Sequence, residues 1–185
     1  VASTVPPLEI AFAINDGMIA DAHIQKQGDP GKRTQGALVR RGFLQVLGGQ
    51  KLPESAKGSG RLELADWLTQ PDNPLTARVM VNRVWHYHFG RGLVTTPSDF
   101  GVRGTAPTHP GLLDHLATEF MNNGWSVKQM HRAIMTSRTY RLANDDHAAN
   151  LAVDPGNQLL WRASRRRLDA EQLRDALLVF SGELD

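Results

Sequence analysis

One segment, residues 73–90, constrains the fold more than any other part of the sequence. Asn73 is a favourable helix N-cap, and Pro74 follows it in the first turn, where a missing N–H group does no harm. Apolar residues then recur around most of the helix circumference as far as Gly90, a residue typical of helix ends. Because such a helix must be covered on nearly all sides, the segment predicts the central helix of a mainly α-helical domain.

Further segments carry the apolar spacing of amphipathic helices and complete an irregular domain of about five helices. They cover residues 61–70, 108–122, 126–137 and 169–181. The clearest helix start is Ser126, which is spaced to form a capping box with Gln129, and Asp169 and Gln172 repeat that spacing. Residues 144–157 are polar and predict a loop between the last two helices.

The N-terminal part has a different pattern. Residues 8–26 alternate apolar and polar side chains around Asn15-Asp16-Gly17, which predicts a small β-hairpin. The segments 28–36 and 48–60 are rich in Gly, Lys, Pro and Ser and predict loops. We therefore expect residues 1–58 to be a β/loop segment leading in from a missing upstream domain. Residues 59–185 then form the helical domain, truncated at its C-terminus.

Composition excludes several classes of function. The chain has 41% hydrophobic residues, enough for a core, and no cysteine, which excludes disulfides, thiolate metal sites and covalent haem attachment within it. The longest apolar runs fall short of a membrane span, and a net charge of +2 argues against nucleic acid as a partner. From residue 61 onward acidic and basic residues balance, and every basic one except Lys128 is arginine. These arginines either pair with carboxylates within the fold or bind an anionic ligand.

The central helix places Arg78, Asn82 and His86 in one row at a spacing of four. A polar row on an apolar helix forms either a buried hydrogen-bond network or the wall of a pocket, because buried polar groups need partners. We expect the loop after Gly90 to fold back over the helix and to bring Asp99 to Arg78 as its counter-ion. We expect the candidate binding residues to converge into one polar cluster beside Trp85; they are Arg78, Asn82, Trp85, His86, Arg91, Asp99 and His109.

Three other chemistries fit the sequence poorly, so the catalytic residues stay unknown. His86 and His88 point about 200° apart on a helix, so no metal site is predicted unless one of them meets His109 or His131 through the fold. The glycine-rich loop 89–101 matches neither the Walker loop nor the dinucleotide fingerprint. Ser98 lacks the G-x-S-x-G context of a hydrolase triad.

Many short motifs recur along this chain in a specific order. They lie in residues 73–79, 82–85, 89–94, 96–101 and 108–110, and they continue in residues 125–126, 134–141 and 160–168. In this order they resemble the motifs of a planctomycete-specific domain of unknown function that lies C-terminally in large planctomycete cytochrome-like proteins. The resemblance covers about residues 40–185.

The resemblance implies an exported parent, periplasmic or extracellular, in which other domains of the same polypeptide, including a c-type cytochrome domain, are the partners. It implies no cofactor in this segment, since the haem belongs to the other domain, and it supplies no established activity. Our first hypothesis is an interaction or scaffold domain. The alternative is binding or hydrolysis of an anionic glycan, sulfated or carboxylated, through an arginine-rich site. Whether the domain is an enzyme is left open.

Overall fold

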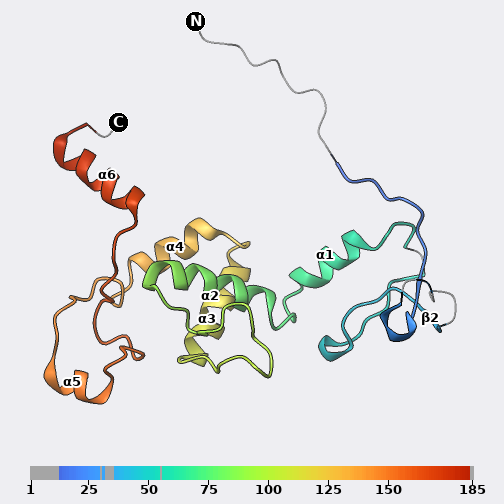
Figure 1. Ribbon diagram of the computed structural model, residues 1–185, viewed down its shortest axis with the longest axis horizontal. Coiled ribbons are helices and arrows are strands. Elements are labelled where there is room, and N and C mark those ends of the chain that lie inside the picture. The colour runs from blue at the N-terminus through green and yellow to red at the C-terminus, as the bar shows by residue number, and fades with distance from the viewer. Residues whose placement is uncertain (1–12, 30, 32–35, 55, 184–185) are drawn as a thin grey trace, which may run out of the picture. The chain divides into compact units, whose positions relative to one another are not determined.

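The structure is a computed structural model that describes residues 13–29, 31, 36–54 and 56–183. The described residues form six α-helices, two short strands and two short 3₁₀ helices (Figure 1). By its internal contacts the chain divides into two compact units, residues 1–73 and residues 74–185. This confirms a mainly α-helical fold with a small antiparallel β element near the N-terminus. The predicted domain boundary at residues 58/59 concerns the sequence domain and stays a prediction.

The first unit contains the β element and helix α1. Strand β1 (Ala22–His23) pairs antiparallel with β2 (Leu38–Val39), and the 3₁₀ helices η1 (Lys26–Gly28) and η3 (Gln45–Leu47) lie in the connecting segments. Helix α1 (Arg61–Thr69) buries Trp67, which stacks on Phe43 at 5.0 Å between ring centroids. The indole N–H of Trp67 donates to the side-chain oxygen of Gln50 over 3.0 Å. Among the described residues of this unit, Trp67 is the one buried hydrophobic side chain.

The β element is not where the sequence placed it. The predicted hairpin turned at Asn15-Asp16-Gly17, but residues 13–21 form no strand, and residues 8–12 lie outside the described residues. The Asp16 carboxylate instead accepts the backbone N–H of Ser59 at 2.8 Å and the guanidinium of Arg61 at 2.7 Å. An Asn-Asp-Gly sequence suits several kinds of turn, and here these long-range contacts of Asp16 decide the local conformation.

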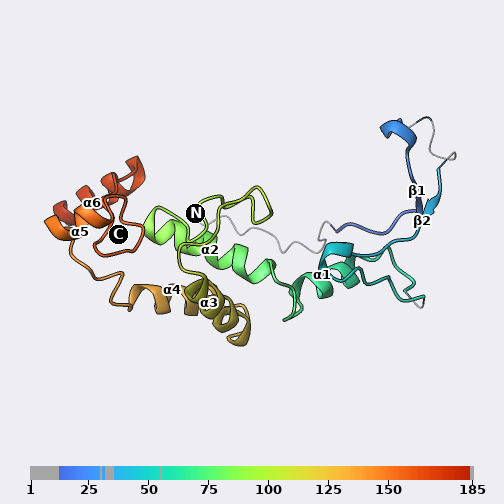
Figure 2. The same ribbon diagram turned by 90° about the horizontal axis from the view of Figure 1, so that it is seen from below.

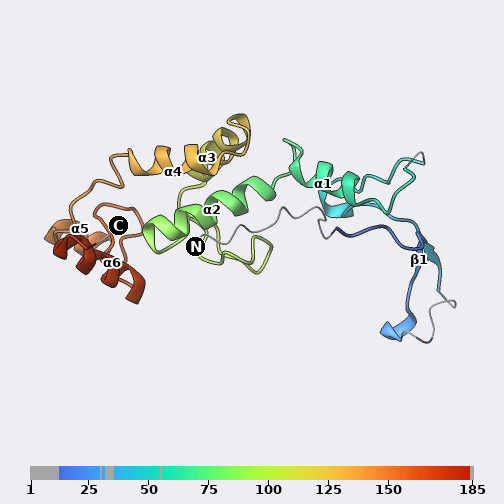
Figure 3. The same cartoon turned by 90° about the horizontal axis from the view of Figure 1, so that it is seen from above.

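The second unit is built on three packed helices. They are α2 (Thr76–Phe89), α3 (Pro110–Asn122) and α4 (Val127–Met135), which lie together in every view (Figure 1, Figure 2 and Figure 3). Their shared core consists of buried aliphatic and aromatic side chains, which include Val81, Leu93, Leu113, Phe120 and Ile134. As predicted, α2 is central, because it buries more side chains than either α3 or α4.

Local signals set most helix ends. Ser126 caps α4 by accepting the backbone N–H of Gln129 at 3.3 Å, and Gly90 ends α2 in a left-handed conformation with φ 78°. Helix α6 (Ala170–Ser181) has a complete capping box of Asp169 and Gln172. The predicted start of α2 was early, because the helix begins at Thr76 with Leu75, not Asn73, in the N-cap position.

One helix was missed. Residues 144–157 were predicted to be a loop, but α5 (Ala148–Val153) lies within them. The alanines and leucine of Ala148-Ala149-Asn150-Leu151-Ala152 are good helix formers, and they outweigh the polar residues on either side. Beyond α5, the buried Asp154 carboxylate accepts the backbone N–H groups of Gln158 and Leu159 at 2.9 and 2.7 Å, which fixes the turn that follows.

Candidate functional site

Asn82, in the middle of the predicted row, is a structural residue. Its side chain is fully buried, its amide N–H donates to the carbonyl of Val94 at 3.0 Å, and its oxygen accepts the N–H of Val94 at 2.9 Å. This pair of hydrogen bonds fastens the loop after α2 to the middle of that helix. A Cβ on Gly92 would lie 2.8 Å from the Asn82 amide, so only glycine allows the close approach. For Asn82 the buried-network interpretation therefore holds.

Arg78 does not pair with Asp99, and that prediction was wrong. The Nε of Arg78 donates to the carboxylate of Asp114 on α3 at 2.7 Å, and its NH1 donates to the carbonyl of Pro74 at 2.6 Å. Asp99 uses one carboxylate oxygen to accept the backbone N–H of Gly101 at 2.9 Å. Asp114 prevails because α3 packs directly on α2 and brings its first turns next to Arg78.

The loop after α2 is held by hydroxyl groups as well. Thr96 Oγ1 donates to the carbonyl of Asp99 at 2.7 Å and accepts the N–H of Thr105 at 3.0 Å. His109 occupies the N-cap position of α3, and its Nδ1 lies 3.0 Å from the hydroxyl of Thr108. The predicted polar cluster of Arg78, Asp99 and His109 therefore divides into separate local contacts. Their role as binding residues stays a prediction.

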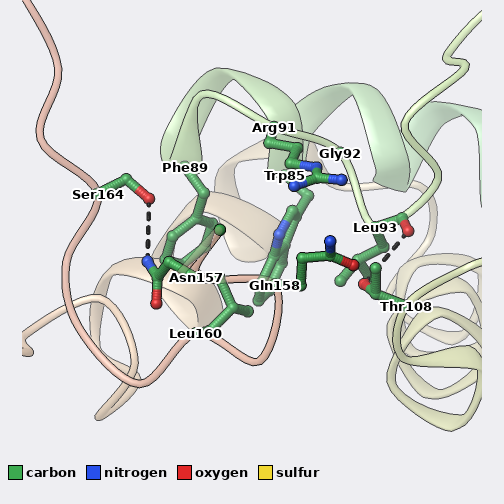
Figure 4. Close-up of a pocket in the computed structure, with 11 residues that line it drawn as sticks. Trp85, Phe89, Arg91, Gly92, Leu93, Thr108, Asn157, Gln158, Leu160 and Ser164 are labelled. Atoms are coloured by element: carbon green, nitrogen blue, oxygen red, sulfur yellow. Dashed lines mark hydrogen bonds between the residues drawn. The ribbon is translucent and has the colours of Figure 1, made fainter. Parts of the chain in front are cut away.

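Trp85 and Arg91 do meet, at a small pocket shown in Figure 4. Trp85 and Phe89 stack with ring centroids 4.2 Å apart and form its apolar wall. Residues from the C-terminal segment, which the sequence did not point to, line the other side. They are Gly156, Asn157, Gln158, Leu160 and Ser164. The accessible volume of about 40 Å³ has room for water, whereas ligand pockets usually measure about 300 Å³ or more.

A second hollow lies at the C-terminal end of α2, and His88, one of its lining residues, pairs with a histidine of α4. His88 Nε2 lies 2.7 Å from His131 Nδ1 on α4, so one ring donates a hydrogen bond to the other. Tyr140 packs edge-on against His88 at 5.5 Å. Arg166 donates to the carbonyls of Tyr87 and His88 at 2.7 and 3.3 Å, at the end of α2 where a cation is favourable.

The surroundings of His88 favour its neutral form. Burial lowers the pKa of His88 below its ordinary value of 6.5, and the neighbouring His131 and Arg166 lower it further. The sequence allowed the fold to bring His88 to His131, and in the structure the two side chains are in contact. Within the described residues, no three His, Asp or Glu side chains gather as metal ligands would.

A third, open hollow contains His86, the last residue of the predicted row. Its ring packs edge-on against Tyr87 at 6.1 Å, and Arg83, Pro97 and Ser98 complete the lining. His86 therefore belongs to a different surface from Arg78 and Asn82. Arg83 and Tyr87 are both exposed.

The fold and these polar contacts define a mainly α-helical domain in which the central helix anchors the loop that follows it. The chain belongs to the PSD1 family, proteins of unknown function (DUF1553), whose family model matches residues 60–185, more than half of the chain. Comparison with curated proteins and with solved structures gave no match. Among the described residues, the helices are all too short or too polar to cross a bilayer.

Proposed function

We propose that this chain is an interaction domain within an exported, multidomain cytochrome-like protein, and that α6 docks on another domain of the same polypeptide. The observation that carries the proposal is the apolar stripe of α6. Leu173, Leu177 and Phe180 follow one another at spacings of four and three, so they share one face of the helix. Their exposed fractions are 52%, 61% and 89%.

The helix that presents this stripe is well defined. Asp169 and Gln172 form a complete capping box at its start, and Gly182, with φ 74°, ends it in a left-handed conformation. Among the described residues, α6 packs against no other helix. A capped amphipathic helix whose apolar face is in water is typical of an interaction surface. Export and the cytochrome partner rest on the resemblance of the sequence motifs.

Hydrogen exchange tests the docking of α6. We expect the amides of residues 170–181 to exchange at least about tenfold more slowly in the natural polypeptide than in the present chain, because docking stabilises the helix. Leu177→Glu should abolish that protection, whereas Asp175→Lys, on the opposite face of α6, should preserve it. Equal exchange in both polypeptides would contradict the proposal. A haem-attachment motif, C-x-x-C-H, in the same gene tests the cytochrome context.

A second candidate function is the binding of an anionic glycan. It is favoured by a difference among the arginines of the second unit. Some of them have partners within the fold, since Arg78, Arg162 and Arg165 form salt bridges with aspartates. In the part of the chain that the structure describes, Arg83 and Arg138 form no salt bridge. Among the described residues, pairing within the fold thus accounts for only some of the arginines, and Arg83 and Arg138 are available to an anion.

A further inference from the structure

The open hollow beside α2 gathers hydrogen-bond donors from two segments. Arg83, His86 and Tyr87 stand at positions i, i+3 and i+4 of α2, so they lie on one face of the helix. Pro97 and Ser98 form the opposite wall. Their segment is held in place by the hydrogen bonds of Asn82 to Val94 and of Thr96 to Thr105. The hollow is therefore built on a fixed part of the second unit.

The side-chain donors of this hollow have no hydrogen-bond partner among the described residues. Within the described residues, the Arg83 guanidinium makes no salt bridge and no side-chain hydrogen bond. The side chains of His86 and Ser98 likewise form no hydrogen bond there, and no carboxylate lines the hollow. Within the described residues, the hollow thus presents a guanidinium, an imidazole and a hydroxyl without a counter-ion. This set of donors matches the oxygens of a carboxylate or a sulfate group.

The hollow also offers an aromatic surface. The Tyr87 side chain is 76% exposed, and the ring of His86 supports it edge-on at 6.1 Å. An exposed aromatic ring next to a cation provides an apolar face on which a flat or saturated ring can lie. The volume of about 230 Å³ is below the usual size of about 300 to 1,000 Å³ for ligand pockets. The size suits one ring with one charged group.

We propose that Arg83, His86 and Ser98 bind the carboxylate or sulfate of an acidic sugar residue whose ring lies on Tyr87. This inference rests on the second candidate function and gives it a site different from the one built on Arg78 and Arg91. Arg83 supplies the bidentate contact to the oxyanion, and Tyr87 discriminates a sugar from a free ion. Because the hollow is open to solvent, binding weakens as salt concentration rises.

The test is a titration of the whole chain, followed by the amide NMR signals of α2 and the 97–98 segment at low salt. The probes are a sulfated disaccharide, a uronic-acid disaccharide, the neutral disaccharide and inorganic sulfate. We expect at least one acidic disaccharide to bind and the neutral one to fail. Arg83→Gln should weaken binding on the order of tenfold, because a charged bidentate contact is lost. Tyr87→Ala should weaken binding of the disaccharide and leave that of sulfate unchanged.

Arg132→Gln is the matched control, because it removes the same charge from an exposed position on α4 that does not line the hollow. Equal weakening by Arg83→Gln and Arg132→Gln would show general charge attraction and overturn the site. Binding that survives Arg83→Gln unchanged would also overturn the site, while leaving the glycan function standing. If neither acidic disaccharide binds, the glycan function itself fails. If sulfate binds as tightly as the sulfated disaccharide, the role of Tyr87 is wrong.

Discussion

Helices α4 and α6 are similar in sequence pattern and opposite in environment. Each begins with a side-chain cap, at Ser126 and Asp169, and each carries an apolar stripe. The stripe of α4 is buried, with Ile134 at 2% exposure, whereas that of α6 is in water, with Leu177 at 61%. Caps and periodicity therefore determine that a helix forms, while its neighbours determine whether its apolar face contributes to stability.

The largest expected effect tests this difference directly. Ile134→Ala should lower the free energy of unfolding by about 3 kcal/mol, because it leaves a cavity among packed side chains. Leu177→Ala should change it by less than about 0.5 kcal/mol, since the side chain is exposed. Urea unfolding of both variants measures the contrast. A similar decrease in the free energy of unfolding in the two variants would mean that α6 is part of the cooperative core and does not differ from α4 in this respect.

The next effect concerns the loop that Asn82 holds. Gly92→Ala should cost about 2 kcal/mol, because its Cβ would push the Asn82 amide away from Val94 and leave buried polar groups without hydrogen bonds. Gly111→Ala in α3 is the matched control. A Cβ there meets nothing within 4 Å, and alanine favours the helix. Thermal unfolding should show a lower Tm for the first variant only. Equal Tm values would mean that the loop adjusts without losing its anchor.

The caps provide a smaller and more local test. Ser126→Ala and Asp169→Ala each remove a side-chain acceptor, a change that costs about 1 kcal/mol at a helix start. The loss at Ser126 should lower the midpoint of global unfolding, because α4 packs on α2 and α3. The loss at Asp169 should raise amide exchange in residues 170–181 and leave the global midpoint unchanged. A global shift in Asp169→Ala would show that α6 is coupled to the core.

The smallest expected effect is the pH dependence from His88, which is only half-buried. The folded chain binds a proton at His88 more weakly than the unfolded chain does, because its pKa lies below 6.5 in the fold. As the pH falls, His88 of the unfolded state takes up a proton near pH 6.5, and His88 of the folded state does so only at its lower pKa. The contribution of His88 to stability is thus present above pH 6.5 and is lost on acidification.

Urea midpoints at pH 7.5 and pH 5.5 measure this contribution. The decrease on acidification should be smaller in His88→Gln than in the natural sequence. Asp16 and Asp154 do not contribute to a difference between pH 7.5 and pH 5.5. Both pKa values lie below 3.8. Side-chain and backbone hydrogen bonds from Ser59 favour the carboxylate of Asp16, and backbone hydrogen bonds from Leu159 and Gln158 favour that of Asp154. An unchanged pH dependence in the variant would show that His88 does not carry it.

Much of the helical fold was predictable because its signals are local. The ends of α1, α3, α4 and α6 follow from Pro, Gly and capping residues that act within one turn of the helix. The errors arose where distant residues compete. Asp16 binds residues 59 and 61 and forms no hairpin turn, and the short helix α5 lies within residues expected to be a loop.

The candidate site was less predictable than the helices. The sequence correctly placed Arg78, Asn82 and His86 on one helix, because a spacing of four needs only the helical period. It could not rank Asp99 against Asp114 as the partner of Arg78, since both follow α2 in the sequence and the choice depends on how α3 packs. It also gave no sign that Asn157 and Gln158 would reach Trp85, which lies more than seventy residues earlier in the chain.

The sequence by itself determined where the five longer helices lie, where most of them begin and end, and that Arg78, Asn82 and His86 lie on one helix. These properties depend on contacts within a few residues along the chain. Only the tertiary structure decided that Asn82 is buried, that Arg78 pairs with Asp114, that His88 meets His131, and that Arg83 faces an open hollow. Such outcomes depend on distances between segments, because a charge or an amide pairs with whichever partner the packing of the helices brings within about 3 Å.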